Sequence, residues 1–119
     1  MTEPSEVERV AEARTRIIEV TADEAIARRT AGSALFLDVR ERHEWNLFRI
    51  PGAMLLPIGD IPASAPGTVP RDRDLIVYCG QGNRSVLATD LLRSMGYARA
   101  ASLSGGVRAW MDAGGELED

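Results

Sequence analysis

The hydrophobic positions of the chain fall into short apolar runs separated by stretches with helical spacing. Nearly unbroken apolar runs at 34–39 and 75–78 predict strands that are covered on both faces. Shorter runs at 16–20, 53–56 and 99–103 predict further strands. Because strands and helices alternate, we predict an α/β fold with a mostly parallel five-stranded sheet and helices on both of its faces.

The helices are predicted from their caps and their apolar spacing. Thr21 followed by Glu24 has the pattern of a capping box, in which each side chain bonds the backbone of the other, and Gly32 ends that helix. Residues 57–70 hold four of the six prolines and two glycines, so we predict mostly loop there with one helical turn. Further helices are predicted over 41–48, over 84–95 and over 106–113.

A chain of 119 residues is long enough for one domain that buries its own core. We expect that domain over 16–115, an N-terminal tail or arm over 1–15 and a C-terminal tail over 116–119. The Glu-, Arg- and Ala-rich N-terminal segment is expected to be a frayed helix or a loose, solvent-exposed arm. Its first residues lack the features of an export signal, and no apolar run approaches the roughly 20 residues of a membrane helix, so we expect a cytoplasmic protein without a membrane partner.

The composition excludes several kinds of chemistry. Fourteen basic and eighteen acidic residues give a net charge of −4, which argues against a nucleic-acid partner. All the basic residues are arginines, which excludes Schiff-base lysine chemistry and, together with abundant alanine, suggests a bacterial protein. The single cysteine, Cys79, and the single histidine, His43, rule out an internal disulfide and a Cys- or His-rich metal centre. We expect neither a metal nor a cofactor.

Cys79 stands at the end of a predicted buried strand, where ligands bind in parallel α/β sheets. Taken alone, such a cysteine is usually an inert, buried small side chain. The glycines that follow change this interpretation, because they permit a turn whose backbone N–H groups surround an anion at the start of the next helix. Such amides favour the thiolate over the thiol, so a reactive thiol is predicted. The candidate anion-binding residues are Gly80, Gln81, Gly82, Asn83, Arg84 and Ser85.

Five motifs appear in the order expected of one protein family. They are Leu37-Asp38-Val39-Arg40-Glu41, His43-Glu44-Trp45, Ile50-Pro51-Gly52-Ala53, Cys79 to Ser85, and Ser104-Gly105-Gly106-Val107-Arg108-Ala109-Trp110. With these motifs the chain resembles the single-domain rhodanese-like sulfurtransferases over residues 20–113. It departs from the family pattern at Phe48-Arg49, where the family commonly has Gly-His, and at Leu55, where an Asn often stands.

The resemblance implies a two-step sulfur transfer through Cys79. The thiolate would take a sulfane sulfur from a donor, either a small anion such as thiosulfate or a protein persulfide, and the cysteine persulfide would pass it to a thiol or to cyanide. One cysteine suffices, because no resolving thiol is needed. Gly80 and Gln81 are neutral where thiosulfate-preferring members often carry positive charge, which leaves the physiological donor open. The resemblance also leaves open whether the protein is a monomer or a homodimer.

Several other residues near the predicted site have two interpretations. Arg84 could clamp an anionic substrate, or it could pair with an acidic residue and brace the loop. Asp38 and Arg40 end a strand at the same sheet edge as the thiol. For these two, a buried ion pair that supports the loops is favoured over contact with substrate. Trp45 and Trp110 are expected to anchor the core.

Two other functions remain open. The chain could be a persulfide relay or a partner-binding module without efficient turnover of small molecules, because a fold does not by itself determine function. A cysteine phosphatase or an arsenate-reductase-like enzyme is disfavoured, because only four residues separate Cys79 from Arg84. The smaller ring of amides suits one sulfur atom better than a tetrahedral oxyanion, and no nearby Asp is an obvious general acid.

Overall fold

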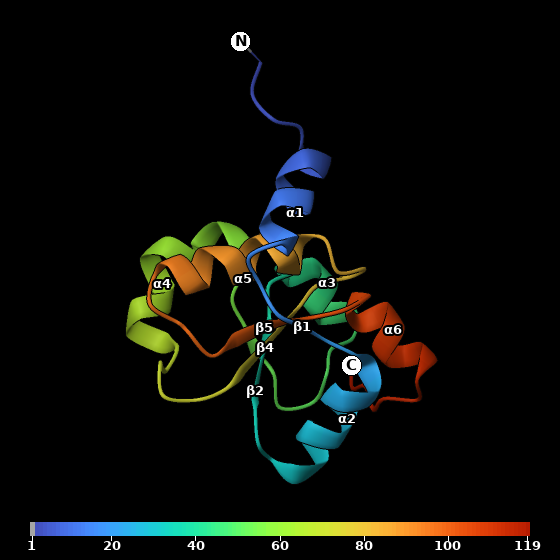
Figure 1. The fold of residues 1–119 in the computed structure, drawn as a ribbon. Helices are drawn as coiled ribbons and strands as arrows, with labels where there is room; N and C mark the ends of the chain where they lie inside the picture. Colours follow the sequence, from blue (N-terminus) through green and yellow to red (C-terminus); the bar gives the residue numbers. More distant parts are fainter. Residues whose placement is uncertain (1) are drawn as a thin grey trace.

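The computed structural model describes residues 2–119 and has a five-stranded sheet between helices (Figure 1). The strands are β1 (Glu19–Val20), β2 (Leu35–Asp38), β3 (Met54–Leu55), β4 (Leu75–Tyr78) and β5 (Ala100–Leu103). Their order is β1-β5-β4-β2-β3, and every pairing is parallel. The predicted five-stranded α/β sheet is therefore confirmed, although β1 is shorter than the expected 16–20. Since Asp38 pairs in register with Tyr78, the loops after β2 and β4 begin side by side at one edge of the sheet.

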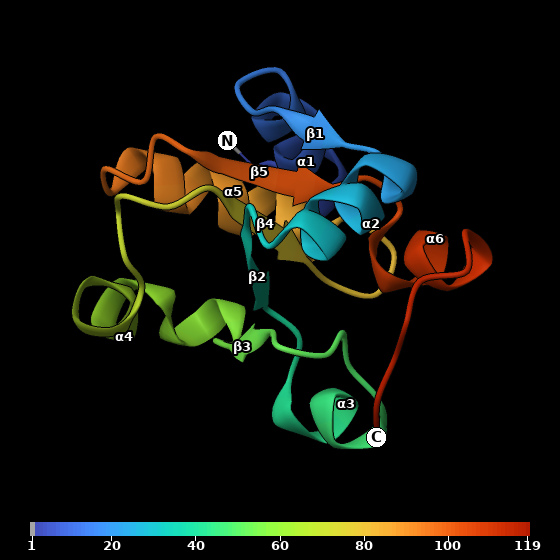
Figure 2. The ribbon, with the colours of Figure 1, turned by 90° about the horizontal axis from the view of Figure 1, so that it is seen from below.

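The helices cover both faces of the sheet, as predicted. They are α1 (Glu6–Arg14), α2 (Ala22–Ala31), α3 (Arg42–Leu47), the 3₁₀ helix η1 (Ile58–Asp60), α4 (Ile61–Thr68), α5 (Arg84–Ser94) and α6 (Gly106–Asp112). Helices α4 and α5 contribute to the core on one face, and α2 and α6 to the core on the other (Figures 1 and 2). No helix within residues 2–119 combines the length and the apolar composition needed to cross a membrane.

Alternate side chains of β4 point to opposite faces of the sheet, as the period of two requires. Leu75 and Val77 pack in the core beneath α4 and α5, and Cys79 continues the same row. Ile76 and Tyr78 pack in the opposite core. The strand pattern therefore places the thiol on the α5 side of the sheet, at the end of the strand.

The prediction of a loop over 57–70 is wrong, because η1 and α4 occupy most of that segment. Pro62 falls in the first turn of α4, where a missing N–H costs no helical hydrogen bond. Ile61, Ala65 and Val69 recur every fourth residue and are buried in the core. This packing outweighs the destabilising effect of Pro66 inside the helix. The helical spacing of the apolar residues is therefore a better guide to this segment than the number of prolines.

Two local expectations also differ from the structure. The hydroxyl of Thr21 accepts from the amide of Glu24 at 3.1 Å, but within residues 2–119 the Glu24 side chain does not return the bond, so only half of the capping box forms. Trp110 is 1% exposed and anchors a core, whereas Trp45 is only half-buried. Trp45 lies on α3, which buries none of its residues, and its ring is covered by the Arg49 guanidinium at 4.9 Å.

The N-terminal segment forms a helix that packs on α5 and projects from the body of the molecule (Figure 1). Val10 and Ala13 of α1 are buried against Val86 of α5. After the helix, Arg16 donates to both carboxylate oxygens of Asp90 at 3.0 and 2.7 Å, which lowers the pKa of Asp90. The helical alternative for the N-terminal segment is therefore present, while the division into a domain over 16–115 with two tails stays a prediction.

Tyr97 ties α4 to the chain that follows α5. Its buried hydroxyl donates to the carbonyls of Ala65 and Val69 at 2.8 and 3.0 Å. We predict that Tyr97→Phe lowers the free energy of unfolding by about 1–2 kcal/mol in urea denaturation, because a buried carbonyl loses its donor. As a control, Ser94→Ala removes an exposed hydroxyl and should change the same quantity by less than about 0.5 kcal/mol. Equal effects of the two substitutions would contradict this role of Tyr97.

Candidate active site

The loop between β4 and α5 wraps backbone amides around the sulfur of Cys79. The amides of Gly82 and Ser85 both donate to Cys79 Sγ at 3.2 Å. The side chain of Cys79 is 1% exposed. The predicted turn of inward-facing amides is thus present for two of the loop residues, and one of them, Ser85, lies in the first turn of α5.

Close approach of the turn before α6 holds this loop in place. Gly82 has a φ of 96°, and a Cβ built on it would lie 2.9 Å from the backbone nitrogen of Gly105. A Cβ on Gly106 would lie 2.5 Å from the carbonyl oxygen of Cys79. That carbonyl accepts from the amide of Val107 at 2.8 Å. The Gly105-Gly106 pair therefore lets the start of α6 bind the backbone of the cysteine loop directly, a role that the motif alone did not reveal.

Two buried hydroxyls extend the hydrogen bonding of the sulfur. Cys79 Sγ lies 3.5 Å from Ser85 Oγ, which lies 2.9 Å from Ser102 Oγ of β5. Within residues 2–119, Ser102 Oγ has no hydrogen-bond partner other than Ser85. The thiol donates to Ser85 Oγ, and either hydroxyl can donate in the bond between Ser85 and Ser102. The sulfur is therefore bonded to a buried pair of hydroxyls as well as to two backbone amides.

Arg84 forms a two-point ion pair with Glu44 of α3. Its Nη1 and Nη2 atoms donate to the two carboxylate oxygens at 2.7 and 2.9 Å. The hydrogen bonds from Arg84 lower the pKa of Glu44 from its ordinary value of 4.5 to about 2, against the opposing effect of partial burial. The guanidinium is thus engaged by a carboxylate and links the loop to α3.

Asp38 and Arg40 form the expected buried pair at the end of β2. Arg40 Nη2 donates to Asp38 Oδ2 at 2.8 Å. Arg40 is 2% exposed and Asp38 is 0% exposed. Arg40 also donates to the carbonyl of Phe48 at 2.7 Å, and its guanidinium lies over the rings of Phe48 and Tyr78. Burial raises the pKa of the Tyr78 hydroxyl, which accepts from the amide of Ile50. The Asp38–Arg40 pair therefore holds in place the chain on both sides of α3.

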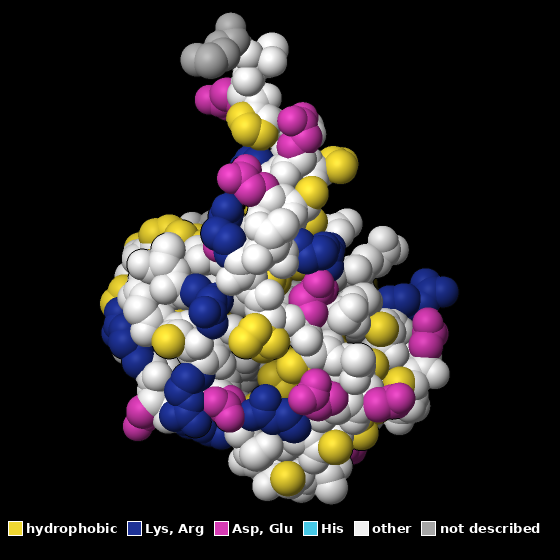
Figure 3. Space-filling view, in the orientation of Figure 1, with side chains coloured by type: hydrophobic (Ala, Val, Ile, Leu, Met, Phe, Trp, Pro, Cys, Tyr) yellow, Lys and Arg dark blue, Asp and Glu magenta, His cyan; other side chains and the backbone are white. Residues whose placement is uncertain are grey.

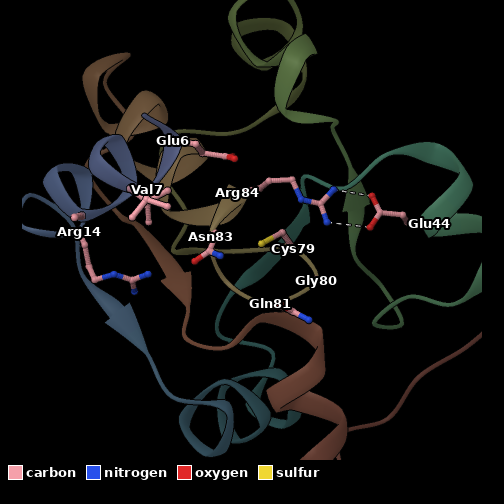
Figure 4. A pocket seen from close by; sticks show the side chains of 11 residues that line it. Glu6, Val7, Arg14, Glu44, Cys79, Gly80, Gln81, Asn83 and Arg84 are labelled. Atoms are coloured by element: carbon pink, nitrogen blue, oxygen red, sulfur yellow. Dashed lines mark hydrogen bonds and ion pairs between the residues drawn. The ribbon is translucent and has the colours of Figure 1, made fainter. Parts of the chain in front are cut away.

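A cavity of about 780 Å³ opens above the cysteine loop (Figure 4). Its lining comes from three parts of the chain. They are the cysteine loop with the start of α5, Glu44 of α3, and one face of α1. The lining residues are Cys79, Gly80, Gln81, Asn83, Arg84, Glu44, Glu6, Val7, Val10, Ala11 and Arg14. In Figure 4 the α1 side chains lie on the other side of Cys79 from the Arg84–Glu44 pair. The thiol is therefore reached through this cavity despite its small exposure.

The structure brings most, but not all, of the predicted site residues to this cavity. Gly82 and Ser85 donate to the sulfur and do not line the cavity, and the fully buried Asp38 does not line it either. Arg40 lines a neighbouring cavity of about 560 Å³ that shares Glu44, Gly80 and Gln81 with the first. The contribution of α1 was missed, although the spacing of its apolar residues, Val7, Val10 and Ala11, is that of one helical face. Within residues 2–119, no group of three or more His, Cys, Asp or Glu side chains could hold a metal ion.

Comparison with known proteins identifies relatives of this chain. The family model described as the rhodanese-like domain matches residues 21–113. A sulfurtransferase of Allochromatium vinosum is 37% identical over 89 residues, which cover 73% of this chain and 82% of that protein. The human thiosulfate:glutathione sulfurtransferase is 34% identical over 95 residues, which cover 69% of this chain and 83% of the relative.

Among solved structures, a Rhodopseudomonas palustris protein of unknown function superposes on this chain with a TM-score of 0.90 and 28% identity. The superposition covers 99% of this chain and 97% of the other, which is described as a possible tyrosine phosphatase. The family match and the two sulfurtransferases support sulfur transfer as the general activity.

The Arg84–Glu44 pair should make stability depend on pH in the acid range. Because folding lowers the pKa of Glu44, the contribution of the pair is present above about pH 4.5 and is lost as the pH falls through about 2. We predict that Glu44→Gln lowers the free energy of unfolding by about 1 kcal/mol at neutral pH, a modest value because solvent screens the pair. Urea denaturation of both proteins should show this difference narrowing as the pH falls. If the difference in free energy of unfolding between the two proteins stayed constant down to about pH 3, this role of the pair would be contradicted.

The hydroxyl pair should affect the reactivity of the thiol. We predict that Ser102→Ala slows alkylation of Cys79 by iodoacetamide about threefold to tenfold at neutral pH, because Ser85 loses the hydroxyl that holds its Oγ beside the sulfur. Thr89→Val is the matched control, since Thr89 carries a buried hydroxyl without a hydrogen-bond partner in residues 2–119. This control should leave the alkylation rate unchanged, and equal slowing in the two variants would rule out a role of the hydroxyl pair in the reactivity of the thiol.

Proposed function

Because this chain belongs to the rhodanese-like domain family, we propose that it is a sulfurtransferase in which Cys79 carries the transferred sulfur as a persulfide. The observation that carries the proposal is the environment of Cys79 Sγ. The sulfur accepts hydrogen bonds from two backbone amides at 3.2 Å and lies at the floor of a cavity open to small molecules. Donors fixed in place before the charge arrives stabilise a sulfur anion without reorganisation.

The proposed reaction has two steps, in which one sulfane sulfur atom moves twice. In the first, the Cys79 thiolate attacks the outer sulfur of the donor, the new S–S bond forms, and the bond within the donor breaks. With thiosulfate the leaving group is sulfite, which departs with the electron pair. In the second step a thiolate or cyanide attacks the terminal sulfur of the persulfide, and Cys79 leaves as the thiolate. The cysteine ends as it began, so no external oxidant or reductant is consumed.

The backbone of the loop would hold the terminal sulfur of the persulfide. The amides of Gly80, Gln81, Asn83 and Arg84 have no hydrogen-bond acceptor within residues 2–119. All of these residues line the cavity above Cys79. A terminal sulfur anion placed in the cavity would therefore lie near unpartnered donors at the start of α5, where the helix dipole also favours negative charge.

Arg84 is proposed to brace the loop and not to clamp the donor. Its guanidinium already makes two short hydrogen bonds with Glu44, and a donor anion would have to compete with that carboxylate. Asp38 and Arg40 are proposed to support the adjacent chain. The human relative is named for thiosulfate and glutathione, which supports thiosulfate among the donors to test and a thiol among the acceptors.

The structural neighbour described as a possible tyrosine phosphatase makes phosphate ester hydrolysis the competing function. The loop of this chain disfavours it. Arg84, which would have to bind the phosphoryl oxygens, is occupied by Glu44. Glu44 has a pKa of about 2 and is deprotonated at neutral pH, so it cannot protonate a leaving group.

Intact-mass measurement after treatment with thiosulfate tests the proposal. We expect the protein to gain the mass of one sulfur atom and to lose it again when cyanide or a thiol is added. Cys79→Ser, which keeps the size of the side chain but removes the sulfur, should gain nothing.

Two other outcomes would identify the competing functions. Gain of sulfur from a persulfidated protein but from none of the small donors would indicate a relay in place of an enzyme for small molecules. Turnover of p-nitrophenyl phosphate, combined with failure to gain sulfur from any donor, would overturn sulfur transfer in favour of hydrolysis.

A further inference from the structure

One wall of the active-site cavity comes from α1, which precedes the segment matched by the family model. Helix α1 turns Val7, Val10 and Ala11 toward the cavity, with Glu6 and Arg14 beside them. Val7 is 79% exposed although it is apolar. Hydrophobic side chains are visible on the projecting helix in Figure 3, among acidic and basic ones. Exposed apolar side chains that border a cavity are typical of a ligand-binding wall.

The size of the cavity indicates a substrate larger than an inorganic sulfur anion. A volume of about 780 Å³ lies within the range of roughly 300–1,000 Å³ typical of sites for organic ligands. Thiosulfate has five heavy atoms and fills on the order of 100 Å³, if each takes up to about the volume of a water molecule. Most of the space above Cys79 would remain unused by such a donor.

The charges of the lining also favour an organic ligand over a dianion. Two acidic residues, Glu6 and Glu44, and two basic residues, Arg14 and Arg84, line the cavity. Arg84 is paired with Glu44, and Arg14 Nη1 is paired with Glu19 at 2.6 Å. The lining therefore has no net formal charge, and it lacks the excess of positive charge that would concentrate a small dianion in a cleft.

We infer that α1 forms the binding wall for the organic part of a low-molecular-weight thiol, the acceptor of the sulfur. The carbon chain of the thiol lies against Val7, Val10 and Ala11, and its sulfur reaches the terminal sulfur of the Cys79 persulfide. The thiol loses its proton to solvent and attacks as the thiolate. The bond to Cys79 breaks, and the products are an organic persulfide and the Cys79 thiolate. This inference rests on the proposed sulfur transfer, which already includes a thiol acceptor, and adds the surface of α1 that would bind its organic part.

A bulky residue on α1 should separate large acceptors from small ones. Ala11 is exposed and lines the cavity, so Ala11→Trp fills space without displacing a buried side chain. With thiosulfate as donor, we expect kcat/KM for reduced glutathione to fall about tenfold or more, while that for cyanide changes less than about twofold. Arg9→Trp is the matched control, because Arg9 is an exposed residue of α1 that does not line the cavity. Arg9→Trp should change kcat/KM for glutathione and for cyanide by less than about twofold.

A binding measurement separates the failure of this inference from the failure of the proposed function. S-methylglutathione cannot accept sulfur, so calorimetric titration reports binding alone. We expect Ala11→Trp to raise its Kd about tenfold and Val7→Ala to raise it about threefold, whereas Arg9→Trp leaves it unchanged. Equal loss with glutathione and cyanide, or no loss with either, would overturn the inference. If no variant turns over sulfur but the Kd values follow this order, the proposed function fails and the α1 binding wall stands.

Discussion

The site depends on one constraint, which is that backbone N–H groups must point at the sulfur of Cys79 from a very tight loop. Two amides do so at 3.2 Å, and the loop can close this far only because Gly82 adopts a positive φ and lies against Gly105. The start of α6 then holds the carbonyl of Cys79 through the amide of Val107. The geometry of the sulfur thus depends on a turn more than twenty residues away in the sequence, at the end of the neighbouring strand β5.

Around this sulfur the structure uses neutral donors more than charge. The hydroxyls of Ser85 and Ser102 are fully buried and bonded to each other, and Arg84 is engaged by Glu44. Neutral amides and hydroxyls at the sulfur create no strong field over the whole cavity. Val7, Val10 and Ala11 of α1 line the cavity above, and the proposed acceptor would bind there.

Much of the fold could be predicted, because the core elements have strong local patterns. β4 was predicted over the residues that form it, and the helix that begins at Arg84 was predicted from its apolar spacing. The errors fall where tertiary packing outweighs local signals. Proline-rich α4 is helical because Ile61, Ala65 and Val69 are buried together, and Trp45 is only half-buried because α3 lies at the periphery. A count of prolines or aromatic residues carries no information about such packing.

By itself, the sequence determined the α/β architecture, the position of the single thiol at the end of a central strand, and the glycine-rich turn that follows it. These depend on residues close together in the chain, so periodicity and spacing are enough to reveal them. Tertiary structure alone decided which carboxylate pairs with Arg84, which hydroxyl is bonded to Ser85, and that α1 lines the cavity. Glu44 is 40 residues from Arg84 and Ser102 is 17 residues from Ser85. Contacts over such separations form only when the sheet brings its strand ends to one edge and the helices close around them.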